Sequence, residues 1–113
     1  MVHQGEDLKF TIQGTDEIRL DEMDFYVSVY PSFQNGVNRI TIEKDAFEEI
    51  KDEDGNSTNT FVGKISYTIT SGMLEGVYNM ELLTKEGEEP YQERSIYVKK
   101  HAFVIESSVS KNL

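Results

Sequence analysis

Residues 74–82 read Leu-Glu-Gly-Val-Tyr-Asn-Met-Glu-Leu, and this stretch decides the fold of the chain. A turn at Gly76 leads into a run in which Tyr78, Met80 and Leu82 alternate with polar residues, as in a β-strand with one buried face. A tyrosine at the start of such a strand can close one end of a sandwich core while its hydroxyl bonds to backbone nearby. The stretch therefore predicts the penultimate strand of an antiparallel β-sandwich, with Tyr78 sealing the core.

Short runs with the same two-residue alternation occur on both sides of this strand. They lie at residues 8–12, 18–20, 25–29, 38–42, 61–69 and about 91–98 or beyond, and polar or glycine-containing turns such as Asn35-Gly36 separate them. Six or seven strands at this spacing predict an all-β chain. We expect one immunoglobulin-like antiparallel β-sandwich over residues 1–106, followed by a polar C-terminal tail at residues 107–113.

One segment, residues 43–51, has helical rather than strand spacing. Phe47 and Ile50 fall on one side, with Asp45 near the front and Lys51 at the rear. We therefore expect one short helical insert here, packed across an end of the sandwich.

The charge balance limits the classes of partner. The 113 residues include 21 acidic and 11 basic side chains, for a net charge of -10, and no cysteine. A field of this sign repels nucleic-acid phosphates and anionic lipids, so we expect neither nucleic acid nor a membrane as a partner. The absence of cysteine excludes disulfides and thiolate metal sites. The N-terminal residues contain no apolar signal segment, and we expect a soluble product.

The best metal candidate is the acidic loop that holds Asp52, Asp54 and Asn56, where oxygen-bearing side chains alternate as at the start of a calcium loop. Such loops require glycine at the sixth position and glutamate at the twelfth. Ser57 and Gly63 occupy those positions here, so a solvated turn is favoured and we predict no metal site.

No residue pattern points to catalysis. His3 and His101 are the only histidines, and neither is tied by spacing to a nucleophile or a carboxylate. Phosphate-loop and dinucleotide glycine motifs are missing. We therefore predict that the protein is not an enzyme, with no catalytic residues and no cofactor.

Four segments resemble the small immunoglobulin-like domains of tailed-phage virions, which include capsid-decorating domains and the N-terminal domain of upper baseplate proteins. The segments are residues 5–12, 24–30, 74–78 and 94–98. The expected helical insert and the apolar residues beyond Ala102 depart from that family.

The resemblance implies a non-enzymatic structural protein of a bacteriophage virion. An auxiliary capsid (head-decoration) protein, present in many copies and docked on capsid subunits, is the first expectation. A baseplate or tail-fibre attachment domain is an alternative within the virion. A carbohydrate- or matrix-binding sandwich of a bacterial surface or secreted protein is a second, with an extracellular or cytoplasmic location.

Five residues are candidates for the protein interface. Tyr26 and Tyr30 share one face of a predicted strand and either form an exposed aromatic patch or pack against neighbouring strands. Phe103, Val104 and Ile105 are apolar and follow the expected end of the fold, where they could form an arm that reaches a neighbouring subunit.

Overall fold

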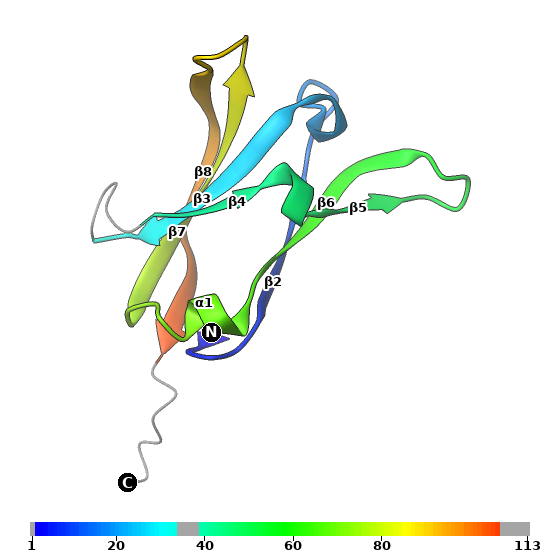
Figure 1. Ribbon diagram of the computed structural model, residues 1–113. Helices are drawn as coiled ribbons and strands as arrows, with labels where there is room; N and C mark the ends of the chain where they lie inside the picture. The colour runs from blue at the N-terminus through cyan, green and yellow to red at the C-terminus, as the bar shows by residue number, and fades with distance from the viewer. Residues whose placement is uncertain (1, 34–38, 107–113) are drawn as a thin grey trace, which may run out of the picture.

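Two β-sheets pack face to face in the computed structural model, which describes residues 2–33 and 39–106 (Figure 1). The larger sheet has the order β1-β8-β7-β3-β4, and the smaller has the order β2-β6-β5. The strands are β1 (Val2–His3), β2 (Leu8–Gln13), β3 (Asp24–Pro31), β4 (Ile40–Glu43), β5 (Glu48–Lys51), β6 (Ser57–Ile65), β7 (Gly76–Glu86) and β8 (Gln92–Glu106). The helical elements are the 3₁₀ turns η1 (Leu20–Glu22) and η2 (Lys44–Ala46) and the helix α1 (Tyr67–Thr70).

This division of strands is that of an immunoglobulin sandwich. The order β2-β6-β5 corresponds to strands B, E and D, and β8-β7-β3-β4 corresponds to G, F, C and C′. The prediction of an all-β, immunoglobulin-like sandwich is confirmed, but the described residues form eight strands rather than six or seven, and the short β1 pairs with β8 in parallel. One position of the constant-type arrangement is empty among the described residues, because no strand A lies beside β2. The first strand is instead the two-residue β1, which pairs with the end of β8.

Tyr78 closes one end of the core as the sequence predicts. Its hydroxyl donates a 2.8 Å hydrogen bond to the Leu74 carbonyl, four residues upstream at the corner between α1 and β7. Its ring stacks on Phe103 at 5.3 Å between centroids, and only 3% of its surface is exposed. Burial raises the pKa of the phenol, which keeps the hydroxyl a donor.

A cluster of aromatic rings fills the other end of the sandwich. Phe25 of β3 meets Phe61 of β6 and Phe47 edge to face at 5.0 and 5.2 Å. Leu20 from η1 packs into the same cluster and is fully buried. The strand predicted at residues 18–20 is therefore wrong. These residues form a loop and the start of a 3₁₀ turn that cover this end of the core.

The short helix lies in a different place from the one expected. Residues 43–51 form the turn η2 and the strand β5, so the helical prediction there is wrong. Phe47 enters the core from the end of the turn, whereas Ile50 faces outward on an edge strand and is 39% exposed. Phe47 and Ile50 thus lie on opposite faces, and their separation of three residues, which is also that of a helix face, misled the prediction.

The helix α1 occupies the end of a segment that the alternation predicts as strand. The Asp7 carboxylate accepts the Tyr67 amide at 2.7 Å, which satisfies a donor of the first turn. Thr70 is fully buried and its hydroxyl donates to the Glu6 carbonyl at 2.7 Å. Contacts with the segment before β2, far away in sequence, therefore stabilise the helical turn.

The last strand continues beyond Val98, as the sequence allows. It runs to Glu106, and its final residues pair with both β7 and β1. The predicted tail at residues 107–113 and the turn at Asn35-Gly36 lie outside the described residues.

Candidate protein-interaction site

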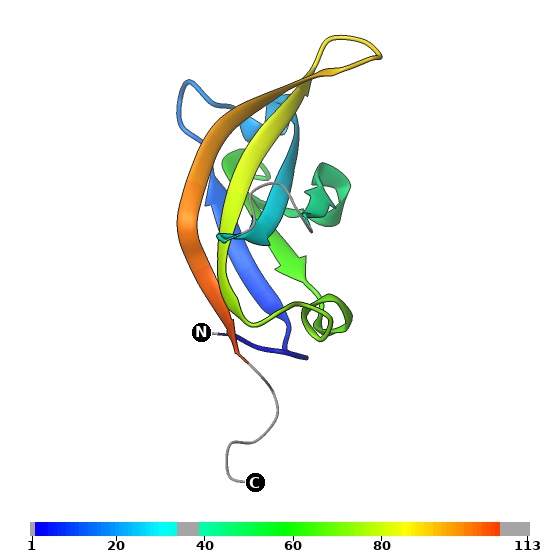
Figure 2. The ribbon, with the colours of Figure 1, turned by 90° about the vertical axis from the view of Figure 1, so that its left-hand side faces the viewer.

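An apolar cleft of about 540 Å³ opens between the two sheets, along the side where β2 faces β8. Figure 2 shows β8 and β7 in the near layer and β2 in the layer behind them. The walls carry half-buried apolar side chains: Leu8, Phe10 and Ile12 from β2, Met80 and Leu82 from β7, and Ile96 and Ala102 from β8. All of these residues except Ile96 pack against the core, so the cleft is a part of the core that the described residues leave uncovered.

The missing strand explains the opening. Among the described residues β2 pairs with β6 alone, and β1 covers β8 only at Ile105 and Glu106. Two strand edges therefore flank the cleft. The edge of β8 is irregular, because its register against β7 shifts twice and His101 has a positive φ of 53°. The six-residue edge of β2 keeps an unbroken register.

Backbone groups of β2 alternate between its partner and this free edge. The Gly14 amide donates to the Asn59 carbonyl at 2.9 Å, on the β6 side. Since successive residues of a strand direct their amides to opposite sides, Lys9, Thr11 and Gln13 present theirs to the open edge. The edge thus offers a ladder of unpaired donors and acceptors beside an apolar surface.

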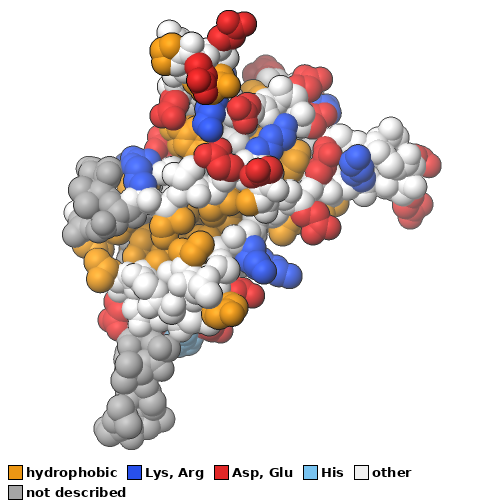
Figure 3. Space-filling model, viewed as in Figure 1, with side chains coloured by type: hydrophobic (Ala, Val, Ile, Leu, Met, Phe, Trp, Pro, Cys, Tyr) orange, Lys and Arg blue, Asp and Glu red, His pale blue; other side chains and the backbone are white. Residues whose placement is uncertain are grey.

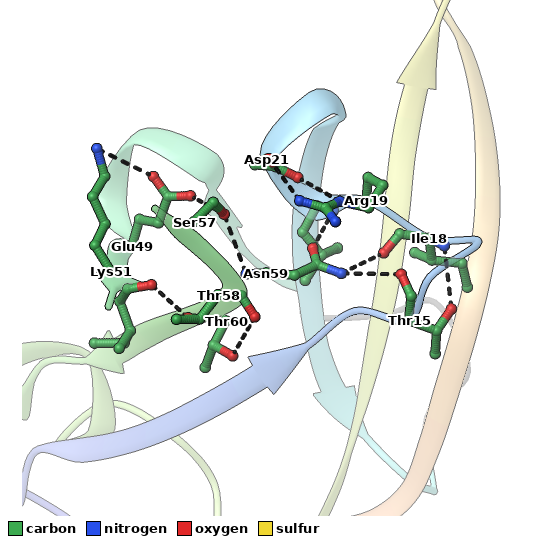
Figure 4. Close-up of polar contacts among 12 residues, drawn as sticks. Thr15, Ile18, Arg19, Asp21, Glu49, Lys51, Ser57, Thr58, Asn59 and Thr60 are labelled. Carbon is green, nitrogen blue, oxygen red and sulfur yellow. Dashed lines mark hydrogen bonds and ion pairs between the residues drawn. The ribbon is translucent and has the colours of Figure 1, made fainter. Parts of the chain in front are cut away.

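Asn59 holds the loop that closes one end of the cleft (Figure 4). Its Oδ1 accepts the buried Leu20 amide at 2.7 Å, and its Nδ2 donates to the carbonyls of Thr15 at 3.1 Å and Ile18 at 2.9 Å. Thr15 and Ile18 belong to the cleft wall. A Cβ at Gly14 would overlap the Asn59 amide, so this loop and β6 approach too closely for any larger residue.

Sequence reasoning missed Asn59. Its backbone φ is 59°, a left-handed conformation for which asparagine is well suited among non-glycine residues. That preference is a weak signal in a polar loop with several Asn, Asp and Gly residues.

The expectation that Tyr26 and Tyr30 form an exposed patch is wrong. Both lie on the outer face of the larger sheet, but only 6% and 7% of their surfaces are exposed. The Arg39 guanidinium covers the Tyr30 ring at 4.1 Å and pairs with Glu81 at 2.9 Å, while Lys85 covers Tyr26. The same burial raises the pKa of Tyr26 to about 12. Long charged side chains thus cover the two tyrosine rings, which are packed and not exposed; packing is the alternative that the sequence left open.

Phe103, Val104 and Ile105 do not form an arm. Phe103 and Ile105 are 9% and 1% exposed and pack in the core, and Val104 is half-buried between them. They lie in the last part of β8, where all three pair with β7 and Ile105 also pairs with β1. The prediction that they reach a neighbouring subunit is wrong.

The acidic loop is the turn of the β5–β6 hairpin. The Asp52 carboxylate accepts the amides of Asp54 and Asn56 at 2.9 Å each, and Gly55 adopts a positive φ of 81°. The Asp52 carboxylate therefore stabilises the turn by accepting hydrogen bonds from nearby backbone amides, as the sequence favours. In the part of the chain that the structure describes, no three His, Cys, Asp or Glu side chains gather as a metal site would need.

The face viewed in Figure 3 carries a second hydrophobic surface, in a band between β4 and α1. Tyr67, Ile69 and Leu74, in and beside α1, are 59%, 42% and 53% exposed. Two further tyrosines, Tyr91 and Tyr97, are 46% and 63% exposed at the β8 side of the long β7–β8 hairpin.

The two histidines stand apart from each other in the fold. His3 Nδ1 lies 2.9 Å from Glu6 on the surface, and the His101 amide donates to Asn79 at the irregularity in β8. None of the described helices is long and apolar enough to cross a bilayer.

Comparison with known proteins adds no relative. No protein-family model matches the chain, and no curated protein or solved structure matches it either.

Proposed function

We propose that this domain is a non-enzymatic structural protein of a phage virion. Its role is that of an auxiliary head-decoration protein, which docks in many copies on capsid subunits. The observation that carries the proposal is the apolar cleft between β2 and β8, with its free strand edge. Uncovered core side chains beside unpaired backbone are the features by which one protein docks on another.

The virion assignment is supported by where the family-like segments lie. Residues 24–30 form most of β3, residues 74–78 form the corner that Tyr78 closes, and residues 94–98 lie within β8. They supply the strands around the cleft and the seal of the core, so the resemblance concerns the framework that creates the docking surface.

Mass spectrometry of purified particles from the source tests the proposal. We expect the protein in particles at a copy number near that of a capsid repeat, and in the head fraction after heads and tails are separated. Recovery in the tail fraction would favour a baseplate or tail-fibre attachment domain. A protein that is expressed but missing from particles would refute the virion role.

Carbohydrate or matrix binding at a bacterial surface is a second candidate, favoured by the exposed rings of Tyr91 and Tyr97. Glycan-array binding that is lost in Tyr97→Ala would support it. Unchanged binding in that variant, or no binding to any glycan, would remove it.

A further inference from the structure

The apolar cleft has a basic border on a protein of net charge -10. Lys9 of β2 and Lys99 of β8 line it from opposite sides. Lys64 lies directly opposite Lys9 on β6, and Lys100 follows Lys99. The single acidic residue of the wall, Glu81, directs its carboxylate to Arg39 at 2.9 Å.

These four lysines differ from the other basic residues that the structure describes. Arg19, Arg39, Lys51, Lys85 and Arg94 each pair with a carboxylate, and Lys44 donates to two backbone carbonyls. Within the described residues, Lys9, Lys64, Lys99 and Lys100 have neither kind of partner. Two of these four, Lys9 and Lys99, line the cleft, and they give it unpaired positive charge on both sides.

We propose that the cleft accepts an extended acidic segment of another protein, which adds to β2 as a fourth strand of the smaller sheet. The inference rests on the proposed docking function and names its surface and the chemistry of its partner. The incoming strand takes the place of the missing strand A and pairs with the outward backbone groups of Lys9, Thr11 and Gln13.

The chemistry of the segment follows from the two sides that it meets. Alternate side chains enter the cleft over Phe10 and Leu82, so they are apolar and of moderate size. The side chains between them face outward beside Lys9, and acidic residues there neutralise the unpaired lysines.

A second copy of this chain fits the cleft less well. Two molecules of net charge -10 repel each other, and Lys9 on the free edge of β2 discourages pairing between identical edges. A foreign acidic strand is attracted by Lys9 and Lys99 at the cleft.

Synthetic peptides of about seven residues, long enough to span β2, test the proposal. In the probe, valine alternates with glutamate; in its matched control, lysine replaces glutamate. By titration calorimetry at low salt we expect the glutamate peptide to bind at least about tenfold more tightly than the lysine peptide. Amide NMR shifts should then centre on residues 8–13 and the facing part of β8. Equal binding of the two peptides, or no binding, would overturn the proposal.

Two variants with a matched control sharpen the test. Thr11→Pro removes one outward amide and leaves the β6 ladder intact, so it should fold and lose peptide binding. Lys9→Glu should weaken binding several-fold, whereas Lys51→Glu, on the opposite edge of the same sheet, should not. Undiminished binding by both cleft variants would contradict the assignment, and so would NMR shifts centred on residues 67–74.

Sedimentation of the free protein closes the test. We expect a monomer. A concentration-dependent dimer, in which hydrogen exchange shows the β2 amides to be protected, would assign the cleft to a second copy and overturn the proposal. These outcomes are separable from the particle test. Failed peptide binding by a protein found in virions refutes only the acidic-strand site, and peptide binding by a protein missing from virions refutes only the virion role.

Discussion

Replacing Asn59 with alanine should cost this domain a large part of its stability. The side chain makes three hydrogen bonds, accepting from the Leu20 amide and donating to the Thr15 and Ile18 carbonyls at 2.7–3.1 Å. The residue is 7% exposed, and Leu20 is fully buried, so water cannot replace the bond to the Leu20 amide. The substitution therefore removes the connection between β6 and the loop that lids the aromatic end of the core.

The magnitude follows from these contacts. A net hydrogen bond contributes about 1 kcal/mol, and a buried donor left without a partner costs about 1–3 kcal/mol. Alanine at a φ of 59° adds about 1 kcal/mol of backbone strain relative to asparagine. The expected loss is about 3–5 kcal/mol, against a total stability of about 5–15 kcal/mol for a domain of this kind.

Urea unfolding followed by circular dichroism measures the loss, and two further variants separate its causes. Asn59→Gly loses the same hydrogen bonds without the strain, so it should be about 1 kcal/mol more stable than Asn59→Ala. Asn79→Ala is the matched control, because Asn79 is equally buried but accepts one bond, from the His101 amide at 2.9 Å. The reasoning is refuted if Asn59→Ala loses less than about 1 kcal/mol, or no more than Asn79→Ala.

Three further predictions concern the core and the outer face. Tyr78→Phe removes the bond to the Leu74 carbonyl and should lower the melting temperature by about 4 °C. An unchanged melting temperature would show that this hydrogen bond does not stabilise the fold. A Cβ at Gly63 would overlap the Phe47 ring, so Gly63→Ala should lower the free energy of unfolding in urea by about 1–3 kcal/mol. Adding Phe47→Leu should restore part of this stability, and no restoration would place the clash elsewhere. Burial raises the pKa of Tyr26 from 10.0 to about 12, so its neutral form stabilises the fold fully below pH 10, and that contribution of up to about 3 kcal/mol is lost as the pH rises through 12. Unfolding at pH 9 and pH 11 should show a smaller decline in Tyr26→Phe than in the unchanged protein, and equal declines would contradict the assigned shift.

The sequence alone determined the fold class and the position of most strands. Alternation at residues 8–12, 25–29 and 76–82 reports which faces are buried, since a strand repeats every two residues and needs no distant information to do so. The role of Tyr78 was predictable for a similar reason: its bond partner is four residues away. The turn at Asp52 was also local, because its carboxylate bonds to its own backbone.

Only the tertiary structure decided what is exposed and where the helix lies. Tyr26 and Tyr30 are buried by Arg39 and Lys85, which come from other parts of the chain, so no pattern within β3 reveals their cover. The helix α1 depends on Asp7, 60 residues upstream of Tyr67. The cleft exists because no described strand pairs with the outer edge of β2, which is a property of the assembled sheets and not of any segment. Short-range periodicity thus determined the strands, whereas the surface that carries the proposed function arises from contacts between residues far apart in the sequence.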